Sequence, residues 1–512
     1  MPMDTYLKLQ NGSDIRGVAL EGVPGEQVNL TPTAAGNLAR AFVCWLSKTA
    51  GGPLEQLTVS VGSDPRLSGP KLKVAVAQAI SELGARVADC GLASTPAMFM
   101  STKLKGYEYD GAVMLTASHL PFNRNGLKFF TPTGGLEKEQ ITELCRIAGE
   151  GAFTPAAVAG PIFPAPELMA DYAAHLVEKV RAGADDPADY QHPLKGLKIV
   201  VDAGNGSGGF FASEVLAPLG ADTRGSRFLE PDGSFPNHIP NPENEQAMRS
   251  ICEATAQSGA DLGIIFDTDV DRAGAVDASG REINRNRIIA LMASIVLEEH
   301  PGTVIVTDSV TSDELGAFIT ALGGVHHRFK RGYRNVINEA IRLNSAGQEC
   351  CLAIETSGHG ALKENYFLDD GAYLISKILI KAARLKREGQ TVDRLLTGLR
   401  EPLETQEFRM KISAADFKAY GSGVLRELES YAARQPSFRI APDNYEGLRV
   451  SFGSGEGDGW LLLRMSLHDP LMPLNIESRV QGGVSAIGEK LYRFLTRFEE
   501  LDSSPLAEYL RH

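Results

Sequence analysis

The chain has 512 residues, of which 43% are hydrophobic and 22% charged, with 51 Lys and Arg against 64 Asp and Glu, so its formal net charge is −13. Single cores stop growing at roughly 250–300 residues, so we expect several domains. The acidic balance argues against a nucleic-acid partner, and no apolar run reaches the ~20 residues of a membrane span.

The first residues, MPMDTYLKLQNGSD, show neither the basic and apolar regions of a signal peptide nor the Arg-rich pattern of a transit peptide. We therefore expect a cytoplasmic protein. The six cysteines are sparse and show no CxxC spacing, which predicts free, buried thiols rather than disulfides or a zinc site.

Short aliphatic runs then alternate with helical patterns. LTVSVG precedes a predicted helix from about Pro70 to Leu83, and GAVMLTA precedes one near Glu137 to Glu150. The same alternation begins again at LKIVVDAGNG and at GTVIVTDSV. Two stretches of linker composition, AFTPAAVAGPIFPAPE and RAGADDPADYQHPLKG, precede the first of these restarts. This alternation is typical of βαβ units and mixed or parallel sheets.

The last hundred or so residues differ. YEGLRVSF, a Gly-rich turn and WLLLRMS predict a β-hairpin, followed by a helix from Val484 to Leu501. We therefore expect an α/β fold of three consecutive mixed-sheet α/β domains and a C-terminal α+β domain around a central cleft. The predicted domains are 1–170, 171–298, 299–403 and 404–512.

Four strand ends carry chemically useful side chains. The first is TASHLPFNRNGLK, residues 116–128, directly after GAVML. Ser118 is a candidate nucleophile because α/β sheets present such groups at strand ends, although most loop serines only make turns. The glycines that flank the serine of a hydrolase elbow are missing, which argues against acyl transfer.

The second strand end carries Asp267, Asp269 and Asp271 after LGIIF. In an extended segment, alternate side chains point the same way, so these carboxylates would form an oxygen-only site suited to Mg²⁺. A solvated acidic turn is the alternative. An EF-hand is excluded because its sixth and twelfth positions would be Arg272 and Ala278.

The third is ETSGHG after CLAI, where Glu355 and Ser357 are suited to sugar hydroxyls and His359 to proton transfer or phosphate binding. The fourth is RMSLHDP after WLLL, where Arg464 and Ser466 could clamp a phosphate. A structural salt bridge is the alternative role of Arg464.

One further motif, GNGSGG at 204–209, satisfies GxGxxG after the strand run LKIVVDA. The acidic residue expected about 20 positions later is poorly placed, since Asp222 comes too early and Glu230 too late. A dinucleotide-dependent oxidoreductase is kept as an alternative on this motif.

Taken together and in this order, the four loops resemble those of the α-D-phosphohexomutase superfamily, over nearly the whole chain. Ser118 and Lys128 match the phosphoserine and lysine of TASHNPxxxNGxK, and the three aspartates with Arg272 match DGDxDR. The remaining matches are Glu355, Ser357 and His359 with GExSGH, Arg464 and Ser466 with the start of RPSGTEP, and the segments around Arg16, Gly62–Gly69, Thr95, Gly233, Asn241–Glu243 and Lys330.

The resemblance implies a phosphohexomutase that interconverts hexose 1-phosphate and hexose 6-phosphate, with glucose as the expected sugar and mannose as the alternative. The phosphoryl group would pass through Ser118 and a hexose 1,6-bisphosphate, which would also serve as activator. One Mg²⁺ would be held by Ser118, Asp267, Asp269 and Asp271. Small sugar phosphates would be the partners, and the protein would be a monomer or homodimer.

The resemblance also assigns roles to the other residues. The implied catalytic residues are Ser118, Lys128, His359 and Arg16. The implied substrate-binding residues are Arg272, Lys330, Glu355, Ser357, Arg464, Ser466 and His468. The four predicted domains would carry, in order, the phosphoserine, metal-binding, sugar-binding and phosphate-binding loops.

The sequence departs from the family pattern at three places. The phosphate loop has Leu467 and His468 where the family has Gly and Thr, Asp14 stands in a segment that is GTSG in the family, and Thr356 is unusual in the sugar loop. These departures support two alternatives: a hexose-1,6-bisphosphate synthase type of phosphotransferase, and a non-enzymatic sugar-phosphate sensor.

Overall fold

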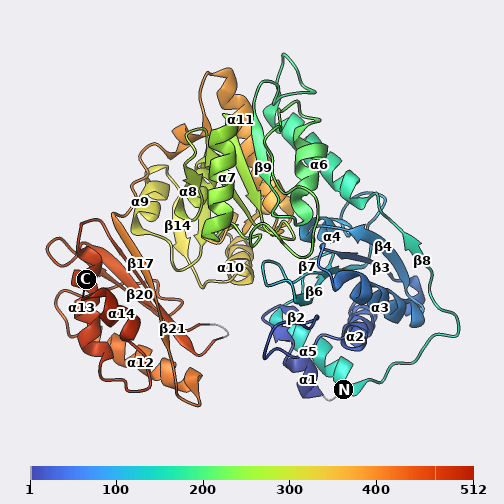
Figure 1. Ribbon diagram of the computed structural model, residues 1–512, viewed down its shortest axis with the longest axis horizontal. Helices are drawn as coiled ribbons and strands as arrows, with labels where there is room; N and C mark the ends of the chain where they lie inside the picture. The colour runs from blue at the N-terminus through green and yellow to red at the C-terminus, as the bar shows by residue number, and fades with distance from the viewer. Residues whose placement is uncertain (1–2, 467–468, 512) are drawn as a thin grey trace. The chain divides into compact units, whose positions relative to one another are not determined.

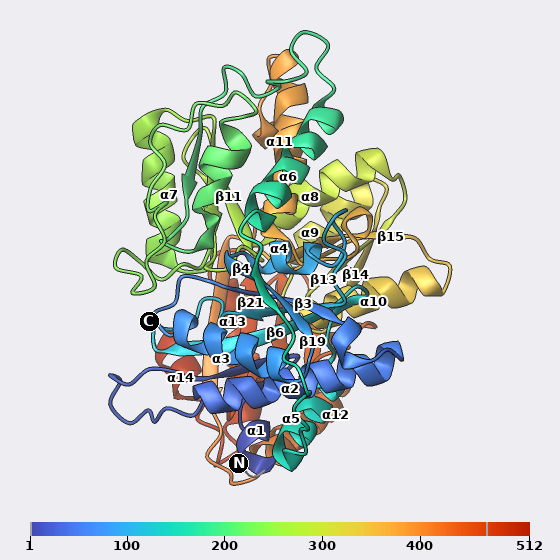
Figure 2. The ribbon, with the colours of Figure 1, turned by 90° about the vertical axis from the view of Figure 1, so that its right-hand side faces the viewer.

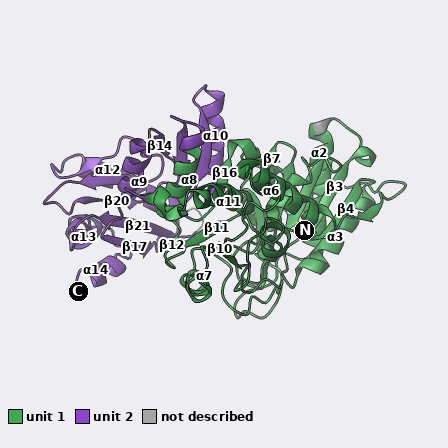
Figure 3. Ribbon diagram, turned by 90° about the horizontal axis from the view of Figure 1, so that it is seen from above, with its two compact units in different colours: residues 1–296, 357–396 green, residues 297–356, 397–512 purple. Residues whose placement is uncertain are grey.

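The computed structural model describes residues 3–466 and 469–511, and these form two compact units (Figure 3). Unit 1 consists of Met1–Val296 and Ser357–Leu396, and unit 2 of Leu297–Thr356 and Thr397–His512. Helices and sheets alternate as predicted, which confirms the α/β fold class. No helix in the described ranges combines the length and the apolar character that crossing a bilayer requires.

The first sheet of unit 1 is mixed. Its order is β1-β2-β6-β5-β3-β4-β8, with β7 paired to β6. β3 pairs in parallel with β4 and β5, whereas β6 runs antiparallel between β5 and β2. The strands are β1 Gln10–Asn11, β2 Asp14–Val18, β3 Thr58–Ser63, β4 Arg86–Leu92, β5 Gly111–Leu115, β6 Arg124–Thr131, β7 Gly134–Gly135 and β8 Ile162–Pro164.

Helices α2, α3 and α5 pack on this sheet (Figures 1 and 2). Their apolar faces and the inward strand residues bury one core that includes Phe42, Val61, Leu127 and Ile141. α2 begins where Thr31 accepts a hydrogen bond from the Ala34 amide, a common N-cap geometry. The helices of this part are α1 Met3–Leu7, α2 Pro32–Ala50, α3 Gly69–Glu82, α4 Thr95–Met100 and α5 Lys138–Glu150.

Gly126 lies in the middle of β6, where a side chain has no room. A Cβ there would lie 2.2 Å from the Ile15 carbonyl oxygen and 2.6 Å from that of Thr116. We therefore expect Gly126→Ala to lower the free energy of unfolding by roughly 1–3 kcal/mol, because backbone atoms cannot move aside as side chains do. Urea denaturation measures this change. Gly52→Ala, where no atom lies within 4 Å of the added Cβ, is the control and should differ little from the parent.

The second sheet of unit 1 has the order β12-β11-β10-β9. β9 and β10 are parallel and joined through α7, while β10 and β11 form an antiparallel pair whose connection contains Asp267–Asp271. Val200, Ile251 and Ile265 belong to the core between α7 and these strands. The elements are β9 Ile199–Asp202, α7 Glu245–Ser258, β10 Leu262–Phe266, β11 Ala273–Asp277 and β12 Glu282–Ile283.

The predicted linker before this sheet is more ordered than its composition indicated. Within it, β8 pairs in parallel with β4 at the sheet edge. The second linker stretch begins inside α6 Leu168–Ala184, which lies beside α11 Gly371–Arg387 (Figure 2). The Tyr172 hydroxyl donates to Asp370 Oδ1 at 2.7 Å, directly before α11. α8 Asn286–Glu299, β16 Gly360–Leu362, a π-helix at Phe211–Leu216 and short 3₁₀ turns are also present.

Unit 2 contains a parallel sheet in which β13 lies between β14 and β15. It also contains the antiparallel order β17-β21-β20-β19-β18, whose inner face packs on α12 and α13 around Val450, Leu461 and Leu474. The strands are β13 Val304–Thr307, β14 Val325–Arg328, β15 Cys350–Ile354, β17 Glu404–Lys411, β18 Arg439–Ile440, β19 Leu448–Phe452, β20 Gly459–Leu463 and β21 Leu471–Ser478. The helices are α9 Asp313–Ala321, α10 Tyr333–Ser345, α12 Phe417–Ala432, α13 Gly483–Leu495 and α14 Ser504–Tyr509.

The predicted helix from Val484 to Leu501 is too long. α13 ends at Leu495, and Leu501 instead forms an antiparallel bridge with Ile412. The amide of Asp502 donates to the Lys411 carbonyl at 2.8 Å, so this segment extends the pairing of β17. Backbone groups that pair with a strand cannot also close helical hydrogen bonds, which is why the helix stops.

None of the six cysteines forms a disulfide in the structure as described. Cys90, Cys145, Cys350 and Cys351 are buried, as predicted, whereas Cys44 and Cys252 are only half-buried.

Candidate active site

Ser118 lies three residues beyond the end of β5, in the loop that leads to β6. Only 2% of the residue is exposed, and its φ of 51° is left-handed, a conformation that costs a non-glycine residue roughly 1–2 kcal/mol. Its hydroxyl donates to Asp267 Oδ2 at 3.0 Å and accepts from Arg272 Nη2 at 2.8 Å. The loop therefore holds the predicted nucleophile in a strained conformation between a carboxylate and a guanidinium.

Asp267, Asp269 and Asp271 gather at the turn between β10 and β11. Each is fully buried, and one carboxylate oxygen from each lies within 4.8 Å of the others. The sequence pattern correctly predicted that the three carboxylates lie together, but the expected extended conformation was wrong. The segment is a turn rather than an extended strand, and Val270 has a left-handed φ of 68°. The turn, not strand alternation, brings the three side chains together.

The aspartate cluster is electrostatically strained. Burial, and then the charges of Asp271 and Asp269, hold the pKa of Asp267 well above its usual range. Burial would also raise the pKa of Asp271, but Lys128, followed by His359 and Arg272, lowers it below its usual range. Asp269 Oδ1 and Asp271 Oδ1 are buried oxygens that no donor in the described part of the chain reaches with a hydrogen bond. Orphaned anionic oxygens of this kind fit a hard divalent cation.

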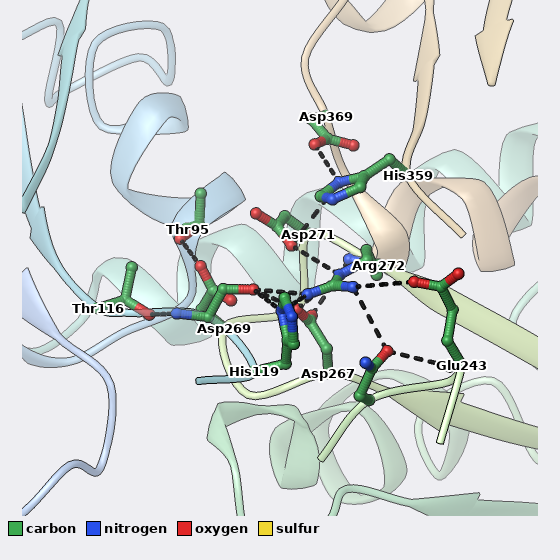
Figure 4. A network of polar contacts seen from close by, with 12 residues as sticks. Thr95, Thr116, His119, Glu243, Asp267, Asp269, Asp271, Arg272, His359 and Asp369 are labelled. Atoms are coloured by element: carbon green, nitrogen blue, oxygen red, sulfur yellow. Dashed lines mark hydrogen bonds and ion pairs between the residues drawn. The ribbon is translucent and has the colours of Figure 1, made fainter. Parts of the chain in front are cut away.

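Arg272 connects Ser118 to the aspartate cluster. Figure 4 shows Arg272 with Asp267, Asp271 and His119 around it. Its Nε donates to Asp267 Oδ2 at 3.1 Å, and its Nη2 donates to the neighbouring imidazole, His119 Nδ1, as well as to Ser118. Burial, followed by the charge of Arg272, lowers the pKa of His119 to about 2, so this imidazole is neutral and accepts the hydrogen bond. Asn241 and Glu243 contact the outer edge of the guanidinium.

Lys128 reaches the same cluster from β6. Its Nζ lies 2.5 Å from Asp271 Oδ2 and 3.5 Å from Asp269 Oδ2, and the residue is 4% exposed. The predicted lysine and the predicted metal ligands, which are 139 or more positions apart in sequence, therefore meet. Ser118 and Lys128 come from one loop and its following strand, so the positions of both depend on β6.

His359 completes the arrangement in unit 1. Its Nδ1 lies 2.5 Å from Asp369 Oδ2 and 3.9 Å from Asp271 Oδ1 (Figure 4). Burial alone would lower the pKa of His359, but Asp369, followed by Asp271, raises it to about 9. The imidazole is consequently charged at neutral pH and can donate a proton. Ser357, two residues earlier, is buried in the same turn.

Arg16 lies on β2, the strand that pairs with β6. Its Nη2 contacts Asp14 Oδ2 at 3.1 Å, and the Asp14 side chain is 6% exposed against 19% for Arg16. Asp14 is one of the departures from the family pattern noted in the sequence. The structure shows that this added carboxylate pairs directly with the predicted phosphate-supporting arginine.

Five predicted substrate-binding residues belong to unit 2, and four of them, including Arg464, lie in the described residues. Glu355 is buried at the end of β15, where its Oε1 accepts from the Gly332 amide at 2.6 Å. Lys330 is exposed, and its Nζ lies 5.8 Å from the centre of the Phe329 ring. Ser466 accepts from the Asp469 amide at 3.2 Å. The fifth prediction assigned to this region, His468, lies outside the described residues together with Leu467.

Arg464 follows β20 and is 7% exposed. Its Nη1 lies 3.7 Å from Glu446 Oε1, and its buried Nε has no hydrogen-bond partner among residues 3–466 and 469–511. Glu446 Oε2 accepts from the Ser309 hydroxyl at 2.5 Å and from the Arg331 amide at 3.0 Å. A buried guanidinium with an unused donor is suited to an anionic ligand, so both readings of Arg464 from the sequence, salt bridge and anion clamp, are compatible with its surroundings.

Sequence reasoning missed several supporting side chains. Asp369 lies outside the four loop motifs, and its contact with His359 reveals its role. Thr95 Oγ1 donates to Asp269 Oδ2 at 2.6 Å, and Thr116 Oγ1 accepts from the Ser118 amide at 2.9 Å. Thr95 and Thr116 lie in segments that match the family pattern, so the sequence could have identified them as candidates.

The GxGxxG match has a packing explanation. A Cβ on Gly206 would lie 2.7 Å from the Thr268 carbonyl oxygen, and the Ser207 amide donates to that same oxygen at 2.7 Å. The chain then continues as a 3₁₀ turn and a π-helix. The glycine allows this segment to approach the aspartate turn closely, which accounts for the motif without a dinucleotide.

Three family models match the chain: phosphoglucomutase/phosphomannomutase alpha/beta/alpha domain I at residues 7–154, domain II at 170–280 and domain III at 284–402. A phosphomannomutase/phosphoglucomutase of Pseudomonas syringae pv. tomato is 30% identical over 447 residues, 86% of this chain and 88% of the relative. A phosphoglucomutase of Neisseria gonorrhoeae is 29% identical over 91% of this chain and 93% of its own length. The crystal structure of a phosphoglucomutase/phosphomannomutase family protein from Burkholderia thailandensis superposes with a TM-score of 0.78 at 27% identity, covering 98% of each chain.

Proposed function

Because this chain belongs to the phosphoglucomutase/phosphomannomutase family of the α-D-phosphohexomutase superfamily, and is therefore a phosphohexomutase, we propose that Ser118 carries the transferred phosphoryl group. The observation that supports this role is the position of the Ser118 hydroxyl, which is buried between Asp267 and Arg272. A guanidinium there would stabilise negative charge on the phosphoryl oxygens during transfer.

Asp267, Asp269 and Asp271, together with the phosphorylated Ser118, are the proposed ligands of one Mg²⁺. Their all-oxygen donor set and the two orphaned buried oxygens support this choice. When bound, the ion would neutralise charge on the transferring phosphoryl group. The protein's own contribution is to hold the three carboxylates together despite their repulsion, which Lys128 and Arg272 offset.

Transfer breaks the bond between phosphorus and Ser118 Oγ and forms one between phosphorus and a sugar hydroxyl oxygen. The sugar hydroxyl must lose its proton, and Ser118 Oγ must gain one as it leaves phosphorus. In the return transfer these steps are reversed: the serine hydroxyl loses its proton and the leaving sugar oxygen gains one. We propose Lys128 and His359 for these proton transfers and Arg16 for contacts to the phosphoryl group. The raised pKa of His359, about 9, favours its role as the donor.

The proposed substrates are glucose 1-phosphate and glucose 6-phosphate, with mannose phosphates as the alternative, and hexose 1,6-bisphosphate is the intermediate and activator. Binding is assigned to Arg272, Lys330, Glu355, Ser357, Arg464, Ser466 and His468. The four-domain division, a cytoplasmic location and a monomeric or homodimeric state complete the proposal.

The direct test of this function is phosphorus NMR of several hexose 1-phosphates incubated with the protein, Mg²⁺ and catalytic hexose 1,6-bisphosphate. We expect the 1-phosphate resonance to be replaced by that of the 6-phosphate, most rapidly for glucose. Accumulation of free bisphosphate beyond the amount added would point instead to a bisphosphate synthase, and unchanged spectra would contradict any enzymatic role.

Removing the guanidinium of Arg464 should weaken substrate binding. A hydrogen bond to a charged group contributes about 1.5–3 kcal/mol, so Arg464→Ala should raise KM for the hexose phosphate roughly 10- to 150-fold. Steady-state kinetics measures the effect, with Arg409→Ala as control because Arg409 is an exposed arginine of the same sheet. An unchanged KM in the Arg464 variant would mean that the Glu446 ion pair is its whole role.

A further inference from the structure

Arg66 is the largest fully buried side chain of the described residues, and within them its hydrogen bonds and its ion pair reach neither the aspartate cluster nor His359. It follows β3 in the segment GSDPRLSG. A guanidinium has five N–H donors and no acceptor, and burying it is costly unless those donors are paired. The partners of Arg66 therefore indicate what the residue does.

Nearly all of these partners are backbone carbonyls of the Ser118 loop. Nη1 donates to the carbonyl oxygens of Pro121 at 2.7 Å and Arg124 at 3.0 Å. Nη2 donates to the carbonyl oxygen of Leu120 at 2.6 Å and to that of Ser118 itself. One planar group thus binds the loop at four points between the end of β5 and the start of β6.

The Nε–H donor of Arg66 is linked to Ser118 through Asp64 and Thr116. Nε of Arg66 donates to Asp64 Oδ2 at 3.2 Å, and Asp64 Oδ2 also accepts from Thr116 Oγ1 at 2.7 Å. Thr116 Oγ1 in turn accepts from the Ser118 amide at 2.9 Å. Arg66 and Asp64 therefore hold the Ser118 backbone at both its N–H and its C=O, on either side of the left-handed φ of 51°.

Arg66 also contacts the part of unit 1 that carries the aspartates. Its backbone forms a parallel bridge with Gly233, and its Cζ lies 5.2 Å from the centre of the Phe235 ring, within the range of a cation–π contact. Gly233 and Phe235 fall in the stretch matched to domain II, as do Asp267 and Arg272. Arg66 therefore contacts the Ser118 loop and also the segment around Phe235, which belongs to the same matched domain as Asp267.

We propose that Arg66 is a positioning residue for phosphoryl transfer. It fixes the strained conformation of the Ser118 loop and holds that loop against the segment around Phe235. The serine oxygen thereby stays aligned with Asp267 and Arg272. This role rests on the proposed function of Ser118 as phosphoryl carrier. Because Arg66 contacts the loop backbone rather than the predicted sugar-binding residues, its loss should affect the rate of transfer and not substrate binding.

The test compares Arg66→Lys and Arg66→Ala with the parent. Lysine keeps the charge but cannot bind four carbonyls at once. We expect kcat, and the rate at which glucose 1,6-bisphosphate phosphorylates Ser118, to fall about 10²-fold with KM unchanged, as misplacement near the reacting atoms produces. Guanidinium ion should restore part of kcat in Arg66→Ala, and hydrogen exchange at residues 116–124 should become faster.

Thr116→Val keeps Arg66 but breaks the link from Asp64 to the Ser118 amide, and it should give a smaller loss of kcat in the same direction. Arg40→Ala is the matched control, since Arg40 pairs with Glu82 on the surface of the same domain. Parent-like kcat in folded Arg66→Lys, or a loss confined to KM, would overturn the proposal. If the parent protein carries no phosphate on Ser118, the carrier role itself fails, and loop exchange then still reports whether Arg66 orders the loop.

Discussion

Ser118→Ala should abolish the phosphorylated form of the protein and lower mutase turnover by at least about 10⁴-fold, because the variant lacks the hydroxyl that we propose as the phosphoryl carrier. Intact-mass spectrometry after incubation with hexose 1,6-bisphosphate measures the first effect, and the phosphorus NMR assay measures the second. In the parent, the mass should show a variable phosphorylated fraction. Full turnover in the alanine variant would disprove the mechanism.

Two further substitutions separate chemistry from folding. Ser118→Gly should be as inactive as Ser118→Ala but more stable by about 1 kcal/mol, since glycine adopts the left-handed φ of 51° without strain. Ser430→Ala removes an exposed hydroxyl on α12 and should leave both the phosphate content and the activity unchanged. Equal stability of the glycine and alanine variants would show that the loop relaxes when the serine is removed.

Asp269→Asn should weaken the response to Mg²⁺. Changing a group that only supports a metal ligand typically lowers metal affinity about 10–100-fold. Losing one of three anionic ligands should therefore raise the Mg²⁺ concentration for half-maximal activity by at least that factor. Binding also stabilises the folded state, so Mg²⁺ should raise the melting temperature of the parent clearly and that of the variant little. The melting measurement needs no activity and therefore tests the site by itself.

Asp222→Asn is the matched control, because Asp222 is an aspartate of the same unit whose ion pair with Arg224 is at the surface. It should keep both the Mg²⁺ requirement and the melting response. If Asp269→Asn kept the parental metal response, the three aspartates would be a structural cluster neutralised by Lys128 and Arg272, and the metal would have to bind elsewhere.

The two arginines proposed to contact phosphate outside the serine loop share one feature. Arg16 is paired with Asp14, and Arg464 lies near Glu446. A phosphate that binds either guanidinium must compete with a carboxylate already beside it, which weakens the net gain from binding. Asp14 is a departure from the family pattern, so under the proposed mechanism its carboxylate would weaken the hold of Arg16 on the bisphosphate.

The local sequence patterns were sufficient for most of the secondary structure and for the four loops. Strand runs such as GAVML and LGIIF became β5 and β10 because buried strands of parallel sheets need continuous apolar residues. The patterns failed where a distant partner decided the outcome. The C-terminal helix stops at Leu495 because Leu501 pairs with Ile412, and the segment before Pro164 forms an edge strand because β4 leaves a free edge.

The sequence by itself identified the side chains proposed to carry the chemistry, namely Ser118, Lys128, the three aspartates and His359, because short motifs place reactive groups at strand ends. Only the tertiary structure decided how these groups are supported: the turn at Val270 that gathers the carboxylates, the Asp369 partner of His359, the Asp14 partner of Arg16 and the hold of Arg66 on the serine loop. These contacts join residues that are mostly far apart in the chain, and their strength comes from burial, which no local pattern records.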